Sequence, residues 1–162
     1  MKILRRILVI LAAAFVVVQF FRPEKNVSQA AEGNHIEQRF PIPIVVQETL
    51  LNSCYDCHSN NTRYPWYAEI QPVAWWLGKH IEEGTGEMNF DEFAGYRPRK
   101  QFVRFRQIEE LITENDMPLP SYTFIHRDAI LSEEQKELVI GWSRAMRDSM
   151  ENRYPSDSLA RR

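Results

Sequence analysis

Two cysteines and a histidine within five residues are the part of this sequence best suited to chemistry. The 162-residue chain has no other cysteine, and both thiols fall in Cys54-Tyr55-Asp56-Cys57-His58. Random placement of two Cys and four His would produce this spacing in roughly one chain in three thousand, so it needs a chemical cause. Each thiol can form a thioether with one vinyl group of a haem, and His58 then lies under the iron as an axial ligand. The motif predicts one haem c, attached covalently through Cys54 and Cys57.

Three other uses of the cysteine pair compete with haem attachment. A thioredoxin-like redox pair needs strands alternating with helices around the motif, and the flanking sequence shows no such alternation. A zinc site would use Cys54 and Cys57 with a distant histidine, but the chain has no second CxxC and no HxxxH to complete four ligands. A disulfide between the two thiols would close too short a loop to stabilise much. Haem c is favoured, and a zinc-bound interaction module remains an alternative.

The second axial ligand decides what such a haem does, because a second side chain favours electron transfer and an open position favours binding or catalysis. We favour Met117, which begins the loop 117–122 of sequence MPLPSY, where two prolines restrict the backbone. The alternative is that Met117 only plugs the haem crevice. His80 would allow bis-histidine ligation instead. The remaining candidates are Met88, Met146, Met150, His35 and His126.

Residues shortly after the motif are candidates for contact with the haem and its propionates. They are Arg63, Tyr64, Trp66, Trp75 and Trp76. Hydrogen-bond donors among them could bind partly buried carboxylates. For each residue alone, ordinary packing or a solvated surface is the competing interpretation. His58 should also donate from its second ring nitrogen to a backbone carbonyl, which fixes its tautomer. Pro65 is close enough in the sequence to be a candidate acceptor, but the sequence alone leaves the acceptor open.

A basic stretch interrupts an otherwise balanced chain, whose net charge is −2. It comprises Arg97, Arg99, Lys100, Arg104 and Arg106. It is either a docking patch for an acidic redox partner or anionic lipid, or a solvated face paired with Glu109 and Glu110. The charge balance of the whole chain does not indicate a nucleic-acid partner.

The elements that would position these residues are helical. Apolar residues from Ile44 recur at helix spacing up to the cysteine motif, and Pro72 opens a second apolar segment that Gly84 is expected to stop. Pro98 opens a long basic helix, and Asn89 with Glu92 is a possible cap before it. A last helix begins at a capping box made by Ser132 and Gln135. No alternating strand pattern is convincing, so we predict an all-α, cytochrome c-like domain around one covalent haem.

The N-terminus predicts export. Lys2, Arg5 and Arg6 precede an apolar run over 7–21, so the following domain should face the periplasm, where haem c is attached. We expect an uncleaved, single-pass transmembrane anchor in the cytoplasmic membrane over 1–21, the alternative being a cleaved signal segment and secretion to the periplasm. Residues 22–38 read as a linker, 39–153 as the haem c domain and 154–162 as a flexible tail.

Several stretches together resemble a small bacterial haem-binding domain family. They are SCYDCHSN at 53–60, YPWY at 64–67, QPVAWW at 71–76 and DMPLPSY at 116–122. The likeness covers about Pro41 to Arg147. It implies a monohaem, cytochrome c-like protein with Cys54, Cys57 and His58 as the haem site.

Two functional hypotheses follow. The first is a membrane-tethered, periplasmic electron carrier, not an enzyme, that passes single electrons between redox proteins of a respiratory chain, with His58 and Met117 as axial ligands. The second is a five-coordinate haem that senses a gas or reduces peroxide, with Met117 only nearby. The sequence offers no clear distal base for the second.

Overall fold

The computed structural model describes residues 1–28 and 33–159, and this part of the chain is helical. The α-helices are α1 (Lys2–Val18), α2 (Ile44–Ser53), α3 (Tyr55–His58), α4 (Val73–Glu87), α5 (Pro98–Thr113), α6 (Pro120–Thr123), α7 (Glu133–Arg153) and α8 (Ser156–Leu159). Short 3-10 turns η1 (Ile36–Gln38), η2 (Trp66–Glu69), η3 (Phe93–Gly95) and η4 (Arg127–Ala129) connect them. The all-α part of the sequence prediction is therefore confirmed.

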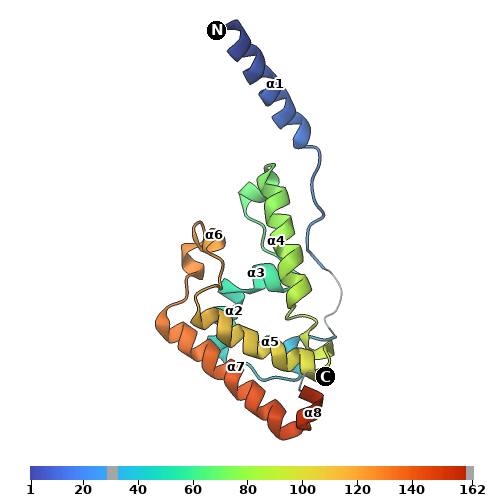
Figure 1. The fold of residues 1–162 in the computed structure, drawn as a ribbon, viewed down its shortest axis with the longest axis vertical. Helices are drawn as coiled ribbons and strands as arrows, with labels where there is room; N and C mark the ends of the chain where they lie inside the picture. The colour runs from blue at the N-terminus through green and yellow to red at the C-terminus, as the bar shows by residue number, and fades with distance from the viewer. Residues whose placement is uncertain (29–32, 160–162) are drawn as a thin grey trace.

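The main core lies where α5 packs along α7 (Figure 1). Phe105 of α5 is fully buried, and its ring meets the edge of Trp142 of α7 at a centroid distance of 5.5 Å. The Ser143 hydroxyl donates to the Phe105 carbonyl at 2.7 Å, which gives this buried polar group a partner. The predicted capping box is present at the start of α7. The segments that carry the candidate site residues are connected to, or pack against, this pair of helices.

The helix α4 passes Gly84 and continues to Glu87, so the prediction that Gly84 ends it is wrong. The reason is tertiary, because the missing side chain lets α4 lie against α3. A Cβ at Gly84 would come within 2.5 Å of the Cys57 carbonyl oxygen. Asn89 is not a helix cap either: it is buried, and its side-chain amide donates to Asn60 Oδ1 at 2.6 Å.

A Schellman motif ends α5 and turns the chain into the MPLPSY loop. Asn115 adopts a left-handed conformation with φ 62°, the position that glycine usually fills and asparagine tolerates. The Asp116 amide donates to the Leu111 carbonyl at 2.9 Å, and the Asn115 amide donates to the Ile112 carbonyl at 3.2 Å. Met117 follows directly, and its peptide bond to Pro118 is cis.

The predicted membrane anchor is corrected. Within residues 1–28 and 33–159, no helix combines the length and the apolar character needed to cross a membrane. The N-terminal helix α1 has 17 residues, and Lys2, Arg5 and Arg6 occupy its first turns. At 1.5 Å per residue it is about 25 Å long, which is less than a hydrocarbon core of about 30 Å. The single-pass localisation predicted from 1–21 is therefore not supported, and α1 extends away from the other helices (Figure 1).

The segment predicted as a linker contacts the helical domain on both sides of residues 29–32, which lie outside the described part. Arg22 and Lys25 both pair with Glu69. Asn26 donates to the Ser59 carbonyl at 2.8 Å, and Ile36 is fully buried. The domain boundaries stay a prediction. The predicted tail contains the short helix α8, and its last residues, 160–162, also lie outside the described part.

Candidate functional site

The cysteine motif sits at a bend between two helices. Cys54 ends α2 with φ −128° and ψ −38°, and a single helical turn, α3, brings His58 back so that its amide donates to the Cys54 carbonyl at 3.0 Å. Burial, and then the neighbouring Cys57, raise the pKa of Cys54 to about 12. Burial, and then the negative charge of Asp56, raise the pKa of Cys57 to about 11. Both free thiols are therefore protonated at neutral pH.

The imidazole of His58 is held in one tautomer. Its Nδ1 lies 2.9 Å from the Met88 carbonyl oxygen, which can only accept, so Nδ1 carries the proton. Burial lowers the pKa of His58, so the ring is neutral at pH 7 and Nε2 keeps its lone pair. The expected donation to a backbone carbonyl is found, but the acceptor is Met88 at the end of α4, and not Pro65. A metal-binding histidine is oriented in this way.

Two adjoining cavities, of about 310 Å³ and about 270 Å³, lie between the cysteine motif and the MPLPSY loop. Cys54, His58 and Met117 line both of them, and Cys57 lines the second. The larger cavity is otherwise walled mainly by apolar side chains of α2, α5 and the segments beside them. These are Leu50, Met88, Phe90, Ile108, Leu111, Ile112, Pro118 and Leu131. Apolar walls with a few convergent polar groups are typical of cofactor sites of this size.

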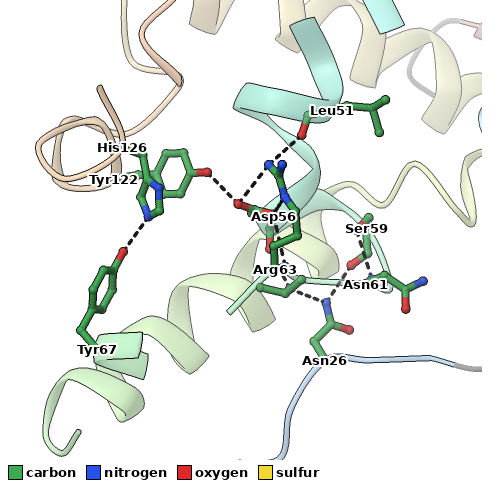
Figure 2. A network of polar contacts seen from close by, with 10 residues as sticks. Asn26, Leu51, Asp56, Ser59, Asn61, Arg63, Tyr67, Tyr122 and His126 are labelled. Atoms are coloured by element: carbon green, nitrogen blue, oxygen red, sulfur yellow. Dashed lines mark hydrogen bonds and ion pairs between the residues drawn. The ribbon is translucent and has the colours of Figure 1, made fainter. Parts of the chain in front are cut away.

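The loop that carries Met117 is fastened to the cysteine motif by a chain of side chains (Figure 2). The Tyr122 hydroxyl donates to Asp56 Oδ2 at 2.8 Å. The Tyr122 ring stacks on His126 at a centroid distance of 4.4 Å, and His126 Nε2 shares a hydrogen bond of 2.7 Å with the Tyr67 hydroxyl. Burial, and then the hydrogen bond to Asp56, raise the pKa of Tyr122, so this hydroxyl stays protonated and donates.

Arg63 braces the motif from the other side of Asp56. Its Nε donates to Asp56 Oδ1 at 2.9 Å, and its Nη2 donates to the Leu51 carbonyl at 3.0 Å (Figure 2). Asp56 is buried, so this ion pair and the Tyr122 hydroxyl satisfy a charge that would otherwise be costly. Arg63 therefore contacts Asp56 of the motif and the helix before it, and it lines neither cavity.

The aromatic residues predicted to contact the haem line neither cavity. Trp66 is 77% exposed, Trp75 and Trp76 are partly exposed on α4, and the Trp76 ring meets His80, which lines the smaller cavity. Tyr64 packs, as Cys57 does, against the small cluster of Ala68, Leu77 and Ile81, and its hydroxyl accepts from the Asn26 amide at 2.7 Å. The turn η2 and the register of α4 thus leave these four aromatic side chains outside the lining of both cavities, and their contact with a haem stays a prediction.

Three residues shape the site although the sequence did not predict them to be part of it. Gly84 permits the close approach of α4 to Cys57, Asp56 joins the motif to the MPLPSY loop, and Arg104 lies in the wall of the larger cavity. Asp56 lies inside the motif, so the sequence could have predicted a role for this charged residue beside two thiols. No sequence feature could have predicted the site roles of Gly84 and Arg104, because those roles depend on which helices pack together.

The cavities also allow a test of whether a haem suits these residues. Two thiols, a neutral imidazole and a methionine side chain line a largely apolar space within one crevice. These donors are of the kinds that bind haem iron and its macrocycle. The site and the helical fold therefore define a haem-binding protein. Residues 13–145 match the family described as the haem-binding domain, and the chain belongs to it. No curated protein and no solved structure matches the chain.

Proposed function

We propose that this protein carries single electrons on one haem c, attached through Cys54 and Cys57, with His58 and Met117 as axial ligands. The observation that supports this is the shared lining: Cys54, His58 and Met117 face the same two cavities, although Met117 is about sixty residues further along the chain. His80 lines only the smaller cavity, so Met117 is the better placed second ligand. When bound, the haem iron supplies one-electron exchange.

The residues of the chain divide this task. The Met88 carbonyl orients His58, and the Tyr122 hydroxyl holds the loop of Met117 against the cysteine motif. Apolar side chains of α5 line the larger cavity. A thioether ligand in apolar surroundings raises the reduction potential, which suits exchange with redox proteins of a respiratory chain. Two protein ligands leave no coordination position for a substrate, which favours an electron carrier over an enzyme.

The first test is the covalent linkage. The purified, haem-loaded protein should keep its haem after extraction with acidified organic solvent, and its pyridine complex should have the spectrum of a haem with two thioethers. Replacing both cysteines, in Cys54→Ala and Cys57→Ala, should release all of the haem into the solvent. A wild-type protein that also loses its haem on extraction would contradict covalent attachment.

The second test concerns Met117. The ferric wild type should show the weak near-infrared band of a sulfur ligand, Met117→Leu should abolish it, and its reduction potential should fall. Met146→Leu is the matched control, because Met146 lies on α7 and packs against the main core. A band that survives Met117→Leu would disprove the assignment. A high-spin ferric spectrum in the wild type would instead support the five-coordinate sensor or peroxidase-like alternative.

A further inference from the structure

Arg104 is the feature of the haem site that the proposed function leaves unused. Among the described residues that line the two cavities, it is the sole arginine or lysine. Its side chain is 18% exposed, whereas Arg106, two residues further along α5, is 50% exposed. The basic stretch is thus neither a uniform docking patch nor a uniform solvated face, because one member turns into the crevice.

The hydrogen bonds of Arg104 are incomplete. One Nη donates to the Gln107 amide oxygen, and Nη2 lies 2.8 Å from Glu87 Oε2. The Nε atom is buried and has no partner among the described atoms. An arginine binds a carboxylate best through two parallel N–H bonds, as Arg63 does when its Nε and Nη2 both approach the carboxylate of Asp56. Arg104 uses only the Nη2 half of the same fork.

Its present partner is easily displaced. The Glu87 side chain is 72% exposed, so its pairing with Arg104 is screened by water, and its carboxylate can turn to solvent at little cost. The other acidic side chains that line the crevice, Asp56 and Glu83, belong to the smaller cavity and would repel a second carboxylate. A negatively charged ligand group that enters the larger cavity therefore has one place to find a cation.

A haem brings such groups, because its macrocycle carries two propionate carboxylates on the edge away from the vinyl groups. An ionised carboxylate in an apolar cavity needs a paired and hydrogen-bonded partner. We propose that Arg104 binds one haem propionate through Nε and Nη2, and that this carboxylate takes the place of Glu87. This assignment rests on the proposed function, since it requires a haem in the same crevice.

The test uses the haem-loaded full chain and reads the propionates directly. Resonance Raman spectra report the propionate bending band, and a redox titration gives the midpoint potential. We expect Arg104→Gln to shift the band and to lower the midpoint potential, because an unpaired carboxylate stabilises the ferric state. Arg106→Gln, which removes the same charge from the same helix outside the cavities, should leave the band unmoved.

Arg104→Lys separates pairing from charge and covers the case in which Arg104→Gln does not fold. A lysine keeps the positive charge but cannot form two parallel N–H bonds to a carboxylate. The propionate band should therefore still shift, while the midpoint potential should stay close to that of the wild type. An unmoved band in both Arg104 variants, or an equal shift in Arg106→Gln, would overturn the assignment of Arg104 and leave the proposed function intact. A wild type that binds no haem would overturn both.

Discussion

The two walls of the candidate haem site are built in different ways. The wall made by residues 54–58 is local: Cys54, Cys57 and His58 occupy one helical turn, and α4 lies directly against it through Gly84 and the Met88 carbonyl. The opposite wall, the loop from Met117 to His126, reaches the crevice by a long route along α5. It is joined to the first wall by side chains, chiefly Tyr122 on Asp56.

The difference shows which half of the site is rigid by construction. Backbone contact at van der Waals distance tolerates no added atom, so the cysteine wall should fail abruptly when its packing is changed. A wall held by single side-chain hydrogen bonds should weaken by steps, because each bond contributes a modest free energy. Substitutions in each wall should therefore differ in how much stability and haem they lose.

Gly84→Ala should damage the cysteine wall most. The added Cβ would lie 2.5 Å from the Cys57 carbonyl oxygen and 3.2 Å from Cys57 Cβ, so α4 must move away from α3. We expect a loss of about 1 to 3 kcal/mol in the free energy of unfolding, measured by urea denaturation, and a lower yield of attached haem. Gly86→Ala on the same helix meets nothing within 4 Å and should be neutral or stabilise by up to about 1 kcal/mol. Equal effects of the two variants would refute this account.

Tyr122→Phe should weaken the loop wall by one step. It removes the hydroxyl that donates to Asp56 while Arg63 continues to pair with that carboxylate. We expect a loss of about 1 to 2 kcal/mol in unfolding free energy and a weaker near-infrared sulfur band, with the haem still attached. Tyr154→Phe, in the main core, should leave the band unchanged. Detachment of the haem in Tyr122→Phe would show that the two walls are not separable.

The support of the loop wall should depend on pH through Glu109, which joins α5 to Arg144 and Arg147 of α7. The hydrogen bond from Arg144 is the main cause of a lowered pKa of Glu109. A folded-state pKa below the ordinary value of 4.5 stabilises the folded protein at pH values above 4.5. This stabilisation is lost as the pH falls through the folded-state pKa. Because Arg144 is exposed, we expect Glu109→Gln to cost only about 0.5 to 1 kcal/mol at pH 7.

Urea denaturation at several pH values measures this difference. The gap between wild type and Glu109→Gln should shrink as the pH is lowered below 4.5. Glu110→Gln, which removes an exposed pair with Arg106, is the matched control and should show a smaller gap. A gap between wild type and Glu109→Gln that grows on acidification has the wrong sign for this mechanism.

Trp66→Ala should have the smallest effect, since it belongs to neither wall. Its side chain is 77% exposed, so the free energy of unfolding should change by no more than about 0.5 kcal/mol. The absorption spectrum of the haem should be that of the wild type. A shifted haem band would restore the role in haem contact that the sequence order suggested.

Much of the fold was predictable from local signals. The helix before Cys54, the proline that opens α5 and the capping box at Ser132 all follow from neighbouring residues, and each is present. The errors at Gly84 and Asn89 have one cause. Glycine and asparagine are both typical of helix ends. Here both residues instead serve packing between segments, because the missing side chain of Gly84 and the polar side chain of Asn89 fit against another part of the chain.

The site divides in the same way. Cys54, Cys57 and His58 were proposed because covalent haem attachment would place all three within five residues, and Met117 was favoured because prolines stiffen its loop. Arg63 and the tryptophans were expected at the haem because of their order in the chain, yet order does not determine the direction of a side chain. Arg104 was grouped with the other basic residues of 97–106 because surface and cavity arginines look alike in a sequence.

By itself, the sequence determined that the cofactor is a haem, in agreement with the family match, and it picked out Cys54, Cys57 and His58 as candidates because they fall within one turn of backbone. The tertiary structure alone decided that Met88 orients His58, that Tyr122 joins the Met117 loop to Asp56 and that Arg104 faces the cavity. The first two contacts join residues that are 30 and 66 positions apart in the chain. The packing of α4 and α5 on the core brings them together, and no local pattern encodes it.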